Sequence, residues 1–186
     1  INPYNLADSV ELIESHYRKL LTHSMKPVSM GGDHTITLPI LRAVAAKHGP
    51  LALVHVDAHA DTNDTMFGEK LTHGTVFRRA IEEGLVDPNS MFQIGLRATG
   101  YSADDFDWAR HKGVTVVTAE ECWYRSLSPL MESIHEQLGK DQPLYLSFDI
   151  DGLDPSVAPG TGTPEPAGLM ASQGLEIIRG TFGLNI

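Results

Sequence analysis

The strongest constraint on the fold is an apolar run at residues 51–56, Leu-Ala-Leu-Val-His-Val, which leads directly into Asp-Ala-His-Ala-Asp. A run of this length and composition suits a parallel strand that is covered on both faces. Charged side chains at the end of a buried strand are costly unless something compensates their charge. The run therefore predicts a buried strand, with a site at its end where the charges of the acidic side chains are compensated.

Strands and helices are expected to alternate along the chain. The apolar and β-branched runs predict strands at residues 26–30, 51–56, 91–96, 114–118 and 143–150. Helical periodicity predicts helices at residues 8–23, 35–47, 76–83, 103–111, 127–138 and 172–179, with Asp8 as the cap of the first. This order predicts an α/β fold with a mostly parallel sheet. The length of 186 residues indicates a single domain over residues 1–186.

Composition narrows the class of partner. The formal net charge of −10 argues against a nucleic-acid partner, because phosphates need a basic face. No apolar run approaches the roughly 20 residues that span a bilayer, so no membrane partner is expected. Cys122 is the only cysteine, which excludes an intrachain disulfide and favours a reducing compartment. We expect a cytoplasmic protein, or a mitochondrial one if the source is eukaryotic.

Six side chains with metal-ligating chemistry follow three of the predicted strands. In open α/β sheets, ligands bind beyond the carboxyl ends of the strands. Two adjacent divalent cations can produce hydroxide at neutral pH. Carboxylates and imidazoles without a thiolate favour manganese, while zinc, cobalt and iron stay open. The candidate metal ligands are His34, Asp57, His59, Asp61, Asp149 and Asp151.

The spacing of these residues makes geometric predictions. Asp149 and Asp151, two residues apart in a strand, would point the same way at about 6.5–7 Å, with Ile150 facing the opposite, buried layer. Asp57 and Asp61 would be roughly 13 Å apart in an extended chain, too far for one dinuclear site. The strand should therefore end near Asp57, and the chain should curl back through His59. An ordinary Asp/Gly turn is the alternative for the Asp149 segment.

The three segments resemble the signature of the ureohydrolase family, which includes arginase, agmatinase and the guanidino-acid hydrolases. The matching stretches are residues 31–34, 56–61 and 147–155, continued by Gly-Thr-Gly-Thr-Pro at 160–164 and by residues 175–180. The likeness is closest to the agmatinase-like branch, which includes guanidinobutyrase and guanidinopropionase. The resemblance implies a three-layer α/β/α fold of the arginase type, and a homotrimer or homohexamer.

The resemblance also implies a reaction and a role for each site residue. Two Mn²⁺ ions per subunit would be held, one by His34, Asp57, Asp61 and Asp149, the other by Asp57, His59, Asp149 and Asp151. A metal-bridging hydroxide would hydrolyse a guanidino compound, agmatine or a guanidino acid such as 4-guanidinobutanoate, to urea and a primary amine. Asp61 would pass the proton of the hydroxide to the leaving amine, and His73 would shuttle protons at the mouth of the site.

The resemblance also gives expectations about the preferred substrate and about whether the sequence covers the whole family domain. The loop at residues 62–73 lacks the Ser/Asn-rich stretch of arginase, which ranks arginine below agmatine and the guanidino acids. The segment at residues 97–101 is expected to line the substrate mouth, where Arg97 would bind a substrate carboxylate or else make a structural ion pair. The family carries a glutamate in a Glu-Val-x-Pro segment beyond the last helix, which this sequence lacks. The family's first strand would lie upstream of residue 1, so we expect a chain truncated at both ends.

Two functions of other classes remain as alternatives. A metal-free relative could act as a structural or regulatory subunit, but all six ligand positions carry ligating residues. A dinuclear phosphoesterase would need cationic groups around the site, and the sequence has no basic cluster there.

Overall fold

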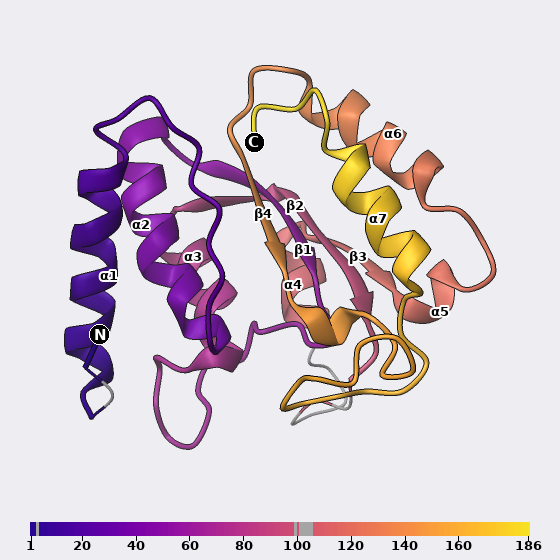
Figure 1. The fold of residues 1–186 in the computed structure, drawn as a ribbon, viewed down its shortest axis with the longest axis horizontal. Coiled ribbons are helices and arrows are strands. Elements are labelled where there is room, and N and C mark those ends of the chain that lie inside the picture. Colours follow the sequence, from indigo (N-terminus) through magenta and orange to yellow (C-terminus); the bar gives the residue numbers. More distant parts are fainter. Residues whose placement is uncertain (3, 99, 101–105) are drawn as a thin grey trace. The chain divides into compact units, whose positions relative to one another are not determined.

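The computed structural model describes residues 1–2, 4–98, 100 and 106–186 (Figure 1). The chain divides into two compact units. The first unit comprises Ile1–Leu51 and Asp61–Asp87, and the second comprises Ala52–Ala60 and Pro88–Ile186. The single domain expected over residues 1–186 stays a prediction. No helix in the described ranges combines the length and the apolar character needed to cross a membrane.

A four-stranded sheet supplies much of the core of the second unit, although the first residues of two of its strands are counted with the first unit. Its strands are β1 (Leu51–Val56), β2 (Val86–Leu96), β3 (Thr115–Thr118) and β4 (Leu144–Phe148), in the order β3-β2-β1-β4. β1 runs parallel to β4, and β2 runs parallel to β3. β1 has a neighbour on each side, and all six of its residues are buried. This confirms the buried parallel strand predicted from the apolar run.

Two helices cover one face of this sheet. α6 (Ser128–Leu138) and α7 (Ala171–Gly180) lie side by side against it (Figure 1). Val54 and Ile94 from the strands pack with Met131, Ile134 and Ile177 from the helices in one apolar core. Because neighbouring residues of a strand point to opposite faces, β1 turns Val54 and Val56 toward these helices and His55 away from them.

The first unit contains the other long helices. α1 (Leu6–Leu20) and α2 (Thr37–His48) contact each other, and α3 (Val76–Glu82) contacts α2. The cap of α1 is Asn5 rather than the expected Asp8, since Asn5 Oδ1 accepts a hydrogen bond from the Asp8 amide at 3.2 Å. Asp8 instead lies in the first turn, where its negative charge interacts favourably with the positive end of the helix dipole.

Some predicted elements differ from the structure. Residues 26–30 form no strand, with Val28 and Met30 93% and 98% exposed. A strand needs a partner for its backbone groups, and this segment pairs with no strand in the part of the chain that the structure describes. α4 (Asp107–Lys112) overlaps the predicted helix 103–111 and ends one residue later, while residues 103–105 lie outside the described residues. A short α5 (Ala119–Cys122) follows β3 and was not expected.

The end of β4 also departs from expectation. β4 stops at Phe148, and the 3₁₀ helix η3 (Ile150–Gly152) follows. The Asp149 side chain accepts a hydrogen bond from the Asp151 amide at 3.1 Å and so caps η3. The prediction that Ile150 faces a buried layer is wrong: Ile150 is 46% exposed, because the chain has already left the strand.

Candidate metal centre

The site begins where β1 and β4 end side by side. Val56 pairs with Phe148, the last residue of β4, and the Asp149 amide donates to the Val56 carbonyl at 2.8 Å. Parallel pairing therefore brings the residues after both strands to the same edge of the sheet, as predicted. Asp57 and Asp149 are the first residues beyond that edge.

Asp57, His59 and Asp151 form a cluster that could hold a metal ion. The Nδ1 atom of His59 lies 3.3 Å from Oδ1 of Asp57 and 3.2 Å from Oδ2 of Asp151. One ligand atom from each of the three residues falls within 4.8 Å of the other two. Asp57 and Asp151 are only 1% and 2% exposed. We call these three residues the carboxylate–imidazole cluster.

The electrostatics of the cluster favour a bound cation. Hydrogen bonds to Asp151 and then Asp57 raise the pKa of His59 to about 10, against the opposing effect of burial. A protonated imidazole thus offsets the charge of two buried carboxylates. A divalent cation offers the same compensation while the imidazole becomes neutral and ligates. Carboxylate oxygens and an imidazole nitrogen are a donor set that divalent metals accept, so the residues present fit a metal.

Backbone and hydroxyl donors hold the two carboxylates in place. The Ala58 amide donates to Oδ1 of Asp151 at 3.1 Å, and the Thr163 hydroxyl donates to Oδ2 at 3.0 Å. The His59 amide donates to Oδ1 of Asp57 at 2.6 Å. These bonds orient the acids without using up all their lone pairs, which leaves acceptor capacity for a ligand.

A buried histidine behind the cluster was missed by the sequence reasoning. Nε2 of His55 lies 2.8 Å from Oδ2 of Asp57, and its Nδ1 lies 3.0 Å from Nε2 of Gln93. Gln93 Nε2 also donates to the Ala60 carbonyl at 2.7 Å, which identifies that atom as the amide nitrogen. His55 Nδ1 therefore accepts, and its Nε2–H donates to Asp57. The available signal was a lone histidine in an apolar strand, two residues before Asp57.

Glu165 is a second residue that the sequence reasoning missed. Its Oε1 lies 3.9 Å from Nε2 of His59, on the side of the ring away from Asp57 and Asp151. A carboxylate in this position can orient a metal-ligating imidazole and increase its basicity. The glutamate stands out in the sequence only as the acid in Thr-Pro-Glu-Pro.

Other predicted site residues lie in the first unit. Nδ1 of His34 lies 2.9 Å from Oδ2 of Asp61, and both side chains are buried. Asp33 caps the 3₁₀ helix η1 (His34–Ile36), because its Oδ1 accepts from the Thr35 amide at 2.8 Å. Asp61 has a left-handed backbone with φ of 51°, so the chain turns sharply after His59, in agreement with the predicted curl. His73 begins η2 (His73–Thr75) and is exposed.

Arg97 follows β2 and turns its guanidinium onto backbone carbonyls, among them those of Asp151 and Glu165 at 2.7 and 2.6 Å. The binding of a substrate carboxylate by Arg97, or a structural ion pair there, stays a prediction. Of the segment expected to line a substrate mouth, residues 99 and 101 lie outside the described part of the chain.

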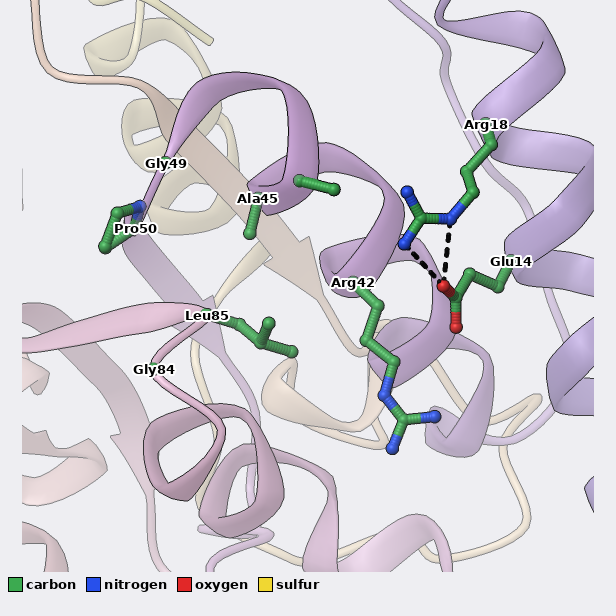
Figure 2. A pocket seen from close by; sticks show the side chains of 9 residues that line it. Glu14, Arg18, Arg42, Ala45, Gly49, Pro50, Gly84 and Leu85 are labelled. Atoms are coloured by element: carbon green, nitrogen blue, oxygen red, sulfur yellow. Dashed lines mark hydrogen bonds and ion pairs between the residues drawn. The ribbon is translucent and has the colours of Figure 1, made fainter.

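The first unit also contains a surface cavity of about 340 Å³. Figure 2 shows Arg18, Arg42 and Glu14 around it, with Arg18 paired to Glu14 at 2.7 Å. Arg42 pairs with Glu83, also at 2.7 Å, and this hydrogen bond raises the pKa of Arg42. Each of the two arginines is thus paired with an acid. None of the predicted site residues lines it.

Comparison with known proteins gives a consistent assignment. The arginase family model matches residues 1–186. The chain is 60% identical to guanidinobutyrase from Pseudomonas aeruginosa, with 100% of this chain and 58% of the relative covered. It is 55% identical to the mitochondrial agmatinase of Gallus gallus, with 100% of this chain and 54% of the relative covered. The chain thus spans little more than half the length of these relatives.

Solved structures agree. Proclavaminate amidino hydrolase from Streptomyces clavuligerus is 43% identical and superposes with a TM-score of 0.91 over 97% of this chain and 60% of its own. Arginase from Bacillus caldovelox is 26% identical, with a TM-score of 0.85 over 94% of this chain and 62% of its own. The predicted α/β fold of the arginase type and the resemblance to the agmatinase-like ureohydrolases are confirmed. The chain therefore belongs to the arginase family.

Proposed function

We propose that the whole protein is a metal-dependent hydrolase that converts a guanidino compound to urea and a primary amine. The observation that carries this proposal is the carboxylate–imidazole cluster, in which two buried acids and a histidine converge at the carboxyl ends of parallel strands. The relatives named guanidinobutyrase and agmatinase support the same chemistry.

The metal is proposed to be manganese, with two ions per subunit. We assign His34, Asp57, Asp61 and Asp149 to one ion, and Asp57, His59, Asp149 and Asp151 to the other. Oxygen and imidazole donors without a thiolate support manganese. When bound, the ions supply a hydroxide at neutral pH and positive charge for the tetrahedral state.

The protein's own groups are proposed to move the protons. Asp61 would accept the proton released by the attacking hydroxide and return it to the nitrogen of the leaving amine. Its backbone turn and its contact with His34 fix the direction of this carboxylate. His73 would exchange protons with solvent, a role that its exposure supports.

The preferred substrate is proposed to be 4-guanidinobutanoate, followed by agmatine, with arginine below both. The order follows the names of the relatives, of which the guanidinobutyrase is 60% identical and the agmatinase 55%. We also propose a homotrimer or homohexamer. The compartment is proposed to be the cytoplasm, or the mitochondrion in a eukaryote, since the relative from Gallus gallus is named mitochondrial.

The test is urea release by the full-length, manganese-loaded protein with 4-guanidinobutanoate, 3-guanidinopropanoate, agmatine and arginine. We expect turnover of at least one of the first three. Asp149→Ala should lose bound manganese and nearly all activity, whereas the exposed Asp141→Ala should keep both.

Each alternative has its own outcome in this test. Full metal stoichiometry in Asp149→Ala would contradict the ligand assignment. A protein that binds no manganese and releases no urea would fit a structural or regulatory subunit. Release of inorganic phosphate from a generic phosphoester, without urea from any guanidino compound, would favour a phosphoesterase.

A further inference from the structure

The guanidinium of Arg97 is engaged by backbone carbonyls on every side. Nε donates to the Pro166 carbonyl at 2.9 Å. Nη1 donates to the carbonyls of Gly95 and Gly152, each at 3.2 Å. Nη2 donates to the carbonyls of Asp151, Glu165 and Leu153, at 2.7, 2.6 and 3.3 Å. A guanidinium has five N–H donors, so the six carbonyls account for all of them, with one Nη2–H shared between two carbonyls.

These carbonyls belong to segments that are far apart in sequence. Gly95 lies in β2, Asp151 and Gly152 lie in η3, and Glu165 and Pro166 lie in the loop that precedes α7. Both the η3 segment and the loop carry side chains around His59, namely those of Asp151 and Glu165. Arg97 thus joins the backbone on the two sides of the imidazole.

The loop is shaped to admit this guanidinium. A Cβ atom at Gly168 would lie 2.5 Å from Nη2 of Arg97 and 2.6 Å from the Asp154 amide nitrogen. No side chain fits there, so the close approach of the loop to Arg97 requires glycine. Burial lowers the pKa of Arg97, while the nearby charges of Asp151, Asp154 and Glu165 oppose that shift.

We propose that Arg97 is a positioning residue that ties η3 to the loop at residues 165–168, and thereby holds Asp151 and Glu165 around His59. This inference rests on the proposed function, because its consequence is the geometry of the metal centre. It assigns Arg97 no contact with the substrate. A planar fork of donors is needed for the tie, and the single ammonium of lysine cannot replace it.

Two substrates separate this role from the binding of a substrate carboxylate. Of the two, 4-guanidinobutanoate carries a carboxylate and agmatine carries none. A carboxylate-binding arginine would affect KM for the acid alone, and lysine would partly restore it through its charge. A positioning arginine would affect metal affinity, and kcat for both substrates, whether or not the charge is kept.

The experiment uses the full-length protein with Arg97→Lys, and with Arg110→Lys as the control on exposed α4. Manganese affinity is measured by titration with detection of free Mn²⁺ by electron paramagnetic resonance. Steady-state kcat and KM are measured with both substrates. We expect Arg97→Lys to weaken manganese binding about 10- to 100-fold and to lower kcat for both substrates. Arg110→Lys should match the wild type.

Unchanged manganese affinity in a folded Arg97→Lys variant, with KM raised only for 4-guanidinobutanoate, would overturn the inference. Should that variant not fold, a crystal structure of the wild type with manganese and 4-aminobutanoate decides. Hydrogen bonds from Arg97 to the carbonyls of Asp151 and Glu165 would support the inference. Hydrogen bonds from Arg97 to the carboxylate of 4-aminobutanoate would overturn it. A wild-type protein that binds manganese without releasing urea would contradict the proposed function. The manganese titration of Arg97→Lys would then still decide whether Arg97 positions the cluster. A wild type that binds no manganese overturns both.

Discussion

His59 shows how much of a site residue's chemistry is set by its neighbours. Its Nδ1 faces two buried carboxylates, and its Nε2 faces a third, from Glu165 at 3.9 Å. The ring is therefore oriented from both ends. If His59 ligates a metal through Nδ1, the Glu165 carboxylate can accept from Nε2–H and make the ligating nitrogen more basic.

Glu165→Gln should weaken manganese binding about 10-fold, because a neutral amide is a poorer acceptor for the imidazole N–H. Titration of manganese into metal-free protein measures the change. The exposed Glu132→Gln serves as the control, since it changes the net charge by the same amount. It should leave manganese affinity unchanged. Equal manganese affinities of Glu165→Gln and the control would show that Glu165 does not act on His59.

At the scale of elements, the short helix α5 depends on a capping box at its first turn. The Thr118 amide donates to Oε2 of Glu121 at 2.7 Å, and the Glu121 amide donates to the Thr118 hydroxyl at 3.4 Å. The bond from the Thr118 amide, and then that from its hydroxyl, lower the pKa of Glu121. An acid with a depressed folded-state pKa stabilises the fold above its unfolded value and loses that contribution as the pH falls through the folded value.

Glu121→Gln should therefore lower the free energy of unfolding by about 0.5–1 kcal/mol at pH 7, a modest amount because the side chain is largely exposed. The difference from the wild type should shrink as the pH falls below the ordinary glutamate value of 4.5. Urea denaturation of both proteins between pH 7 and the acid limit of folding measures this. A difference that stays constant across this range would contradict the capping account.

At the scale of the whole molecule, the net charge of −10 and the buried acids predict that a bound divalent metal stabilises the fold. A ligand that binds only the folded state stabilises it by about 2.7 kcal/mol at a concentration 100 times its dissociation constant. Manganese should therefore raise the unfolding temperature of the full-length protein, and chelation with EDTA should reverse the rise.

Differential scanning calorimetry at several manganese concentrations measures this effect. Asp151→Asn should respond much less than the wild type, because it removes one member of the carboxylate–imidazole cluster. An unfolding temperature that does not depend on manganese would show that the folded state gains nothing from the metal.

The sequence by itself determined the elements whose signal is local. The apolar run of β1 predicted its bounds, and the helical periodicity of residues 127–138 predicted α6 to within one residue. The local sequence pattern gave wrong predictions where contacts with other segments decide the structure. Residues 26–30 have the composition of a strand but remain unpaired in the described structure, and Ile150 leaves β4 because Asp149 caps η3.

The candidate ligands were also available from the sequence, because acids and histidines after apolar runs are unusual enough to be recognised. Only the tertiary structure decided which groups orient them. His55 and Gln93 lie behind Asp57, Glu165 lies beside His59, and Arg97 faces backbone carbonyls. These contacts join segments up to about 70 residues apart. Contacts between such distant segments depend on how the loops pack against the sheet, and the local pattern of residues does not specify that packing.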